Sequence, residues 1–176
     1  MVVKYIVDES RPFFGKFWPN DVPHQLDIDF SMTMGDLLDR AVKNWGDDPA
    51  IWFLDTFVTY KELEDKANRF ATYLDSIGVK KGDVVALHLP NCIQYVIAYY
   101  GCAKIGAIVT GINPTYKPLE ILHQLKLTGA KYILALDALY YNFVKPIESK
   151  WEFKKVIWTN LVDEASGMSS VLKLLG

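Results

Sequence analysis

Four short apolar segments with regular spacing constrain the fold of this chain more than any other feature of its sequence. They begin near residues 84, 107, 132 and 155, at intervals of about 23, 25 and 23 residues, and each interval leaves room for one helix. Strands that alternate with helices in this way form parallel sheets with right-handed crossovers. Because these strands are apolar on both faces, both faces of the sheet should be covered. The spacing therefore predicts an α/β fold with a mostly parallel sheet and β-α-β-α-β-α-β order over about residues 83–158.

Helix signals lie between the strands. Asn91 is a candidate N-cap, Pro118 suits a first helical position, and Gly129 suits a helix stop. Pro146 should shorten or kink the last helix, because it lacks the backbone N–H that a helix interior requires. The expected helices cover residues 92–105, 118–128 and 139–149.

Three further elements are expected before the sheet. Thr33 is a good N-cap for a helix whose apolar stripe runs from Met34 to Trp45. Residues 50–59 indicate a short hairpin around Asp55-Thr56; because that turn has no glycine, Asp55 should adopt a left-handed conformation. The sequence Thr59-Tyr60-Lys61-Glu62 is a capping box that opens a second helix. The buried stripe of that helix is predicted to be Leu63, Ala67, Phe70, Leu74 and Ile77, with Gly78 as its stop.

The first 32 residues lack a regular hydrophobic period. Three prolines and five large aromatic residues lie between Tyr5 and Pro23, a pattern that favours an extended arm. Its aromatic side chains would pack onto the globular part or contact a partner chain, which would make a homodimer through the arm. We therefore predict an arm over residues 1–32 and an α/β lobe over 33–176.

Composition excludes several classes of protein. The chain has 176 residues, 51% of them hydrophobic, and a net charge of −2, which argues against disorder and against a basic nucleic-acid-binding surface. The longest apolar run, 92–107, is interrupted by Gln94 and Lys104, so no integral membrane segment is predicted. The first ten residues do not form a signal peptide, which favours a cytoplasmic location. Cys92 and Cys102, about 15 Å apart if both lie on one helix, should be reduced and inert.

Motifs that would identify catalytic chemistry are missing from the sequence. There is no G-x-G-x-x-G after a strand, no P-loop and no G-x-S-x-G elbow. The three histidines and two cysteines lack metal-binding spacing. His88 alternates with apolar neighbours, which is more typical of a satisfied core histidine than of a ligand. No catalytic and no metal-binding residue is therefore assigned.

Small polar residues follow all four predicted strands. Parallel strands end at one edge of the sheet, and open α/β sheets bind ligands outside that edge. The alternative is that these residues only cap the helices that follow. Gly111 would allow close approach of a ligand to the backbone of the second loop. The polar residues at the strand ends are Asn91, Asn113, Asp137 and Asn160.

Several segments, taken in order, resemble the AMP-forming acyl-CoA synthetases, a superfamily that includes luciferases and peptide-synthetase adenylation domains. Residues 58–63 are similar to a T-Y-x-E-L segment of that family, and residues 90–107 to its P-N…A…G-A helix. Residues 112–131, with Asn113-Pro114 and Thr128-Gly129-Ala130-Lys131, resemble the stretch that follows. The arm looks like the start of members that act on medium- or long-chain fatty acids.

The resemblance implies the N-terminal portion of an enzyme that uses ATP, Mg²⁺ and CoA to convert a fatty acid into its thioester through an acyl-adenylate. The family's phosphate loop, ribose-binding Asp, hinge and catalytic Lys have no match here, so the chain is expected to be inactive alone and to bind no cofactor tightly. Its expected partner is the remaining C-terminal portion of the same enzyme. In some relatives the loop corresponding to Thr110, Gly111, Ile112 and Asn113 lies near the CoA nucleotide, so these residues form the candidate binding edge.

Two other functions are compatible with the residues. The chain could be a stand-alone α/β interaction or regulatory module, such as one part of a split or degenerate synthetase. It could also be a small flavodoxin-like nucleotide binder, for which the strand-end edge would be the site.

Overall fold

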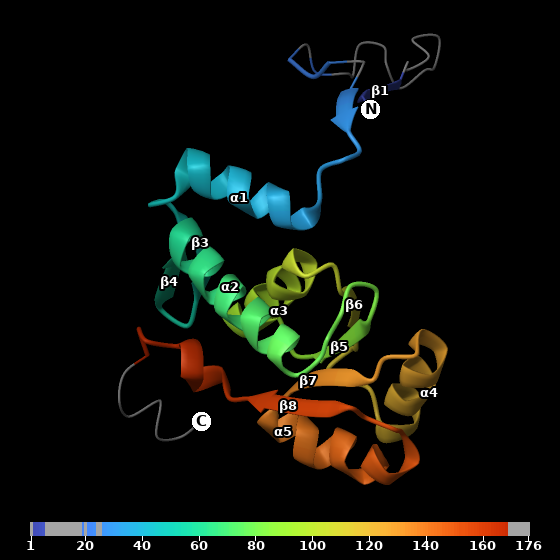
Figure 1. The fold of residues 1–176 in the computed structure, drawn as a ribbon. Coiled ribbons are helices and arrows are strands. Elements are labelled where there is room, and N and C mark those ends of the chain that lie inside the picture. Colours follow the sequence, from blue (N-terminus) through green and yellow to red (C-terminus); the bar gives the residue numbers. More distant parts are fainter. Residues whose placement is uncertain (1, 6–18, 20, 24–25, 169–176) are drawn as a thin grey trace. The chain divides into compact units, whose positions relative to one another are not determined.

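A computed structural model describes residues 2–5, 19, 21–23 and 26–168. The chain divides into two compact units, Met1–Thr33 and Met34–Gly176. In the first, β1 (Val2–Tyr5) pairs antiparallel with β2 (Leu26–Asp29) (Figure 1). The sequence pattern did not predict this pairing, because residues 1–32 lack a regular hydrophobic period. The aromatic segment 13–18 lies outside the described residues.

The second unit contains a four-stranded parallel sheet, as predicted (Figure 1). Its strands are β5 (Val84–His88), β6 (Ile108–Gly111), β7 (Tyr132–Leu136) and β8 (Lys155–Thr159), in the order β6-β5-β7-β8. The chain therefore moves from β5 to β6 on one side, and then to β7 on the other. Strand ends on opposite sides of β5 are thus separated from each other.

Two helices lie between the strands where the sequence predicts them, although the N-cap of one of them differs from the prediction. Helix α4 (Pro118–Thr128) has proline at its start and ends at Gly129, whose φ is +69°. Helix α3 (Ile93–Lys104) has Cys92 as its N-cap, so the prediction of Asn91 was wrong. Cys92 keeps an extended backbone, with φ −148°, which delays the start of the helix by one residue.

A continuous helix does not form after β7. One α turn, α5 (Asp137–Leu139), leads into a π turn, η2 (Tyr140–Val144), and then a 3₁₀ helix, η3 (Lys145–Lys150). Pro146 lies in the first turn of η3, which confirms its predicted effect on this segment. A second 3₁₀ helix, η4 (Leu161–Glu164), follows β8.

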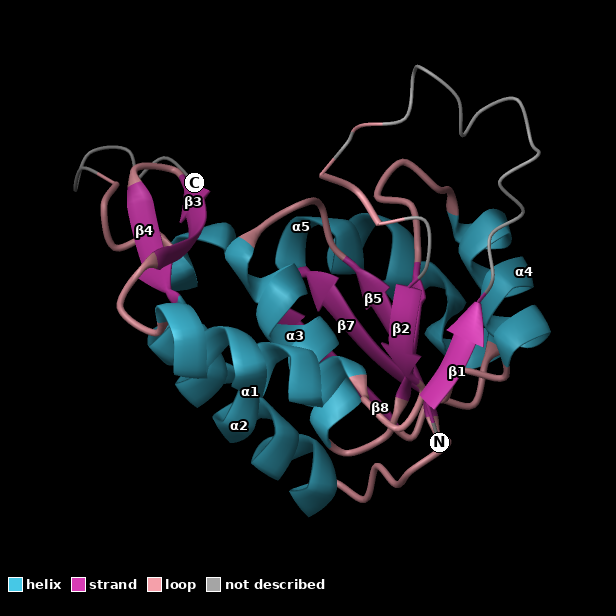
Figure 2. Cartoon of the chain, turned by 90° about the horizontal axis from the view of Figure 1, so that it is seen from above, coloured by secondary structure: helices cyan, strands magenta, loops and turns pink. Residues whose placement is uncertain are grey.

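Both faces of the sheet are covered by helices, as its apolar strands require (Figure 2). Side chains alternate between the faces along each strand. Val85 and Leu87 of β5 pack in a cluster with residues of α3 and of α2 (Tyr60–Ser76). Ala86 packs on the other face, in a cluster with residues of α4 and η3.

The remaining elements of the second unit lie before the sheet in the sequence. Helix α1 (Met34–Trp45) buries Leu38, whereas Met34 and Trp45, the ends of its predicted stripe, are 42% and 53% exposed. The hairpin strands are β3 (Pro49–Phe53) and β4 (Thr56–Thr59). Their turn is centred on Leu54 and Asp55, one residue earlier than expected, with φ of +47° and +55°. The left-handed conformation predicted for Asp55 is confirmed.

Helix α2 begins with the predicted capping box. The Thr59 hydroxyl accepts a hydrogen bond from the backbone N–H of Glu62, while the Glu62 carboxylate accepts one from the backbone N–H of Thr59. Leu63, Ala67 and Leu74 are buried and Phe70 is half-buried, so the predicted stripe has the correct phase. None of the described helices is long and apolar enough to cross a membrane.

Candidate functional site at the end of strand β6

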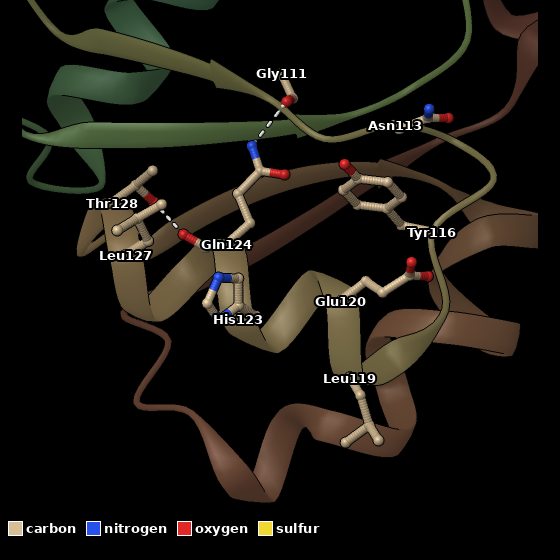
Figure 3. A pocket seen from close by; sticks show the side chains of 9 residues that line it. All are labelled: Gly111, Asn113, Tyr116, Leu119, Glu120, His123, Gln124, Leu127 and Thr128. Atoms are coloured by element: carbon tan, nitrogen blue, oxygen red, sulfur yellow. Dashed lines mark hydrogen bonds between the residues drawn. The ribbon is translucent and has the colours of Figure 1, made fainter.

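A pocket of about 720 Å³ lies where β6 ends, between the following loop and the outer face of α4 (Figure 3). The end of β6 contributes the backbone of Gly111, the loop contributes two side chains, and the helix contributes residues at positions one turn apart. The lining residues are Gly111, Asn113, Tyr116, Leu119, Glu120, His123, Gln124, Leu127 and Thr128.

Gln124 connects helix α4 to the end of β6 through side-chain hydrogen bonds. Its side-chain amide donates to the carbonyl oxygen of Gly111 at 2.8 Å and to the hydroxyl of Thr110 at 3.0 Å. One turn later, the hydroxyl of Thr128 donates to the backbone carbonyl of Gln124 at 2.8 Å (Figure 3). These hydrogen bonds fix the position of α4 relative to the end of β6 at the floor of the pocket.

Asn113 shapes the loop above that floor. Its side-chain oxygen accepts hydrogen bonds from the backbone N–H of Thr115 at 3.0 Å and from the Thr115 hydroxyl at 2.9 Å. The N-cap of α4 is Lys117, whose backbone N–H donates to the Glu120 carboxylate at 2.8 Å. Asn113 therefore does not cap the helix that follows it; it stabilises the turn that forms one wall of the pocket.

The four residues of the predicted binding edge have different positions. Gly111 and Asn113 are exposed and line the pocket. Thr110 is half-buried and bonded to Gln124. Ile112 is 2% exposed, its side chain lies in the core, and its backbone N–H donates to the Leu87 carbonyl at 2.8 Å. Thr110 and Ile112 thus support the edge, and only the other two can reach a ligand in this pocket.

The other polar strand ends do not join this pocket. Asn160, after β8, donates from its side-chain amide to the Asp137 carboxylate, after β7, at 2.7 Å. Asn160 also caps η4 by accepting from the N–H of Val162 at 2.9 Å. Asn91 lines a separate pocket of about 270 Å³ beside β3 and α3. The single edge expected from the sequence is therefore divided among three places.

His88, at the end of β5, lies behind the loop that carries Asn113. It is completely buried, and the ring of Phe143 meets it edge-on, with centroids 6.5 Å apart. The backbone of Asn113 and Pro114 faces the imidazole, yet neither ring nitrogen makes a hydrogen bond of normal geometry. Burial lowers the pKa of His88 below its ordinary value, and the facing backbone opposes this only in part. The expectation of a core position is confirmed, whereas satisfied hydrogen bonding is not.

The charge of the pocket limits what it can hold. Its lining includes one carboxylate, Glu120, and neither lysine nor arginine. Phosphate groups need cationic side chains or converging N–H donors, and Glu120 would repel them. Tyr116, Leu119 and Leu127 instead offer apolar and aromatic surface, which suits an uncharged ring. Among the described residues, no group of three or more His, Cys, Asp or Glu side chains could hold a metal ion.

Sequence reasoning missed the contribution of α4 to the site. Glu120, His123, Gln124 and Leu127 recur at helical spacing on a face away from the buried residues Ile121, Leu122 and Leu125. Three of these four residues are polar, and a face of this composition usually indicates only solvent exposure. The signal that could have identified it is its position immediately after a strand that ends in glycine and a short polar loop.

A parallel sheet with helices on both faces and a pocket at one strand end is an α/β architecture that occurs in proteins of many functions. The sequence is more specific: the model of the family described as AMP-binding enzyme matches residues 38–172. The chain belongs to this AMP-binding enzyme family, which confirms the resemblance inferred from the motifs.

Several proteins that this chain resembles are CoA ligases. The chain is 34% identical over 156 residues to a long-chain-fatty-acid–CoA ligase of Escherichia coli O157:H7 and 34% identical over 139 residues to one of Bacillus subtilis. These alignments cover 88% and 79% of this chain, but only 28% and 24% of the ligases. A fatty acyl CoA synthetase structure from Mycobacterium tuberculosis is 25% identical, with a TM-score of 0.67 over 77% of this chain and 28% of its own. An anthranilate CoA ligase structure with 22% identity shares the fold, with a TM-score of 0.71 over 80% of this chain and 27% of its own.

Proposed function

We propose that this chain is the N-terminal part of an ATP-dependent, AMP-forming ligase that joins a medium- or long-chain fatty acid to CoA in the cytoplasm. The observation that carries the proposal is the identity of 34% to a long-chain-fatty-acid–CoA ligase across 88% of the chain. The matched part is about a quarter of that ligase, so the remaining polypeptide is the main partner of this lobe.

The adenylation step belongs to the remaining polypeptide. Transfer of an adenylyl group requires donors that surround the phosphates of ATP and a site for Mg²⁺. The described residues fit neither group: the pocket has no cation, and no acidic cluster could hold the metal. We therefore assign no catalytic residue to this chain, and its role is to provide a rigid lobe with a ligand pocket.

The pocket at the end of β6 is proposed to hold the uncharged part of CoA. Tyr116 offers an aromatic face for the adenine base. The phosphates of CoA would extend away from Glu120 into solvent or toward the remaining polypeptide. This orientation follows from the charge of the lining residues.

The CoA proposal predicts selective binding of adenosine. Titration of the ¹⁵N-labelled chain with CoA or adenosine should shift the amides of Gly111, Asn113, Tyr116 and Gln124, while inorganic pyrophosphate should not. The reason is that the lining is neutral or acidic. Asp137, which lies on the other side of β5, should not shift. Shifts produced by pyrophosphate but not by adenosine would reject this orientation.

The second prediction concerns activity. Given ATP, Mg²⁺ and palmitate, the purified chain should release no pyrophosphate above background, because the described residues provide no cradle for the phosphates of ATP. A coupled phosphate assay measures the release, with intact Bacillus subtilis ligase as the positive control. Turnover by the chain, in a preparation free of contaminating ligase, would show that the catalytic part lies within these 176 residues.

A further inference from the structure

The buried ring of His88 lies directly behind one wall of the pocket at the end of β6. The backbone N–H of Ile112 donates to the Leu87 carbonyl at 2.8 Å, which brings the next residues, His88 and Asn113, together where the two strands end. Side chains alternate along β5, so His88 shares with Ala86 the face of the sheet that packs against α4 and η3. The ring is therefore enclosed between the sheet and the loop that carries the pocket wall.

Two backbone carbonyls of that loop face the ring. Pro114 has no backbone N–H, so its carbonyl is the group that meets the imidazole, and the backbone of Asn113 likewise favours the charged ring, as an acceptor does. A neutral imidazole has one N–H and can donate to only one of these carbonyls, which leaves a lone pair facing the other. An imidazolium donates from both nitrogens. The two acceptors therefore match the protonated ring of His88 better than the neutral ring.

The carbonyl of Asn113 also closes the turn that forms the pocket wall. It accepts a hydrogen bond from the backbone N–H of Tyr116 at 3.0 Å, while the Asn113 side chain accepts from Thr115. A donor from His88 at the same carbonyl would compete with the Tyr116 N–H and draw the turn toward the sheet. Both Asn113 and Tyr116 line the pocket (Figure 3). A change at the buried ring can thus reach a bound ligand through one turn of the chain.

Charged groups near the other side of the ring are engaged elsewhere. The ring of Phe143 in η2 meets His88 edge-on, and the Nζ of Lys117 lies 4.9 Å from the centroid of that phenyl ring. In the same layer, the Tyr140 hydroxyl donates to the Glu148 carboxylate at 3.2 Å. Burial lowers the pKa of His88 and the two carbonyls oppose this, with no charged side chain of the described residues contributing. His88 therefore responds to pH through its burial and the loop backbone, not through an ion pair.

We propose that His88 is a positioning residue for the pocket at the end of β6: protonation of its ring draws the Asn113–Pro114 backbone toward the sheet and loosens the wall that carries Tyr116. Protons reach a buried ring during local opening of the fold, so no ligand has to enter. The consequence for binding rests on the proposed function, because the ligand there is the adenosine part of CoA. The neutral ring leaves the turn closed and the pocket formed, and acid weakens binding.

A titration without ligand tests the coupling between ring and turn. The ¹⁵N-labelled chain carries His123→Gln, because His123 lines the pocket and could itself titrate. Between pH 7.5 and 5, the amides of Thr115 and Tyr116 should shift with the same midpoint as the His88 ring protons, below pH 6.5. At pH 5 the Tyr116 amide should exchange at least about threefold faster than in the same chain with His88→Phe. Unchanged amides of β7 show that the fold is intact.

Several results of this titration would overturn the proposal. Turn amides that do not follow His88, or that titrate equally in the His88→Phe chain, would show that the ring only fills the core. A folded chain in which His88 stays neutral down to pH 5, or loss of the β7 amides before the ring titrates, would show that protonation does not move the turn. His88→Gln, which is polar and does not titrate, serves as the comparison if the phenylalanine variant does not fold.

Adenosine binding tests the consequence for the pocket. In the His123→Gln chain, the Kd of adenosine should be at least about threefold higher at pH 5.5 than at pH 7.5, and adding His88→Phe should remove this difference. Glu120 is present in both chains, so its contribution is common to them. Equal ratios in the two chains would overturn the regulation of the pocket by His88. Absence of adenosine binding at either pH would reject the proposed CoA site instead, and the titration without ligand would still decide whether His88 positions the turn.

Discussion

At the scale of single residues, His88 makes the fold sensitive to acid. Its pKa in the folded chain is lowered by burial below the ordinary value of 6.5, so the unfolded chain binds the proton more tightly. Stability should therefore be highest above pH 6.5 and fall as the pH drops through and below that value. The fall contributed by this residue should be at most about 1.4 kcal/mol per pH unit. Urea unfolding between pH 7.5 and 5 measures it.

The control separates His88 from other titrating groups. His88→Leu cannot take up a proton, so its unfolding free energy should lack this part of the pH dependence, even if its stability differs at pH 7.5. His123→Gln, at an exposed histidine, should keep the profile of the unmodified chain. If the unmodified chain and His88→Leu show parallel profiles, the buried ring is not responsible.

At the scale of elements, the contact between α2 and α3 depends on Gly101. A Cβ at this position would lie 2.8 Å from a ring carbon of Phe70 and 3.1 Å from the carbonyl oxygen of Ala67. Gly101→Ala should therefore lower the unfolding free energy by about 1–3 kcal/mol, although alanine is the better helix former. Thermal or urea unfolding measures the loss, and Phe70→Leu in the same chain should recover part of it. A stabilised Gly101→Ala variant would show that the two helices can separate at low cost.

Elements with local signals could be predicted from the sequence, whereas the site required knowledge of packing. The capping box at Thr59 and the left-handed Gly129 depend on a few neighbouring residues, and both form as expected. The N-cap at Cys92 depends instead on how the chain leaves β5 and enters the core, which Asn91 could not reveal. Likewise, the pocket needs the position of Gln124 on α4 relative to β6, a contact between residues 13 and 14 positions apart. The regular spacing of the strands predicts the sheet but does not specify the order of the strands in it. That order, β6-β5-β7-β8, separates the polar residues that were expected at one binding edge.

At the scale of the whole molecule, the second unit should fold without the first. Among the described residues, its three clusters of buried core residues all lie between Leu38 and Ile147. Deletion of residues 1–33 should leave cooperative unfolding and an α/β circular dichroism spectrum, with Tm changed by less than about 4 °C if the cost is under about 1 kcal/mol.

A second truncated chain serves as the control for this prediction. A chain that ends at residue 130 lacks β7 and β8, and with them Tyr132, Ile133 and Leu134, which belong to two of the core clusters. That chain should melt without cooperativity and bind a hydrophobic dye such as ANS. The reason is that β5 loses its neighbouring strand β7, and the core on each face of the sheet loses the side chains of that strand. If the chain without residues 1–33 behaves in the same way, the arm is part of the core, and the division of the molecule into two independent units is wrong.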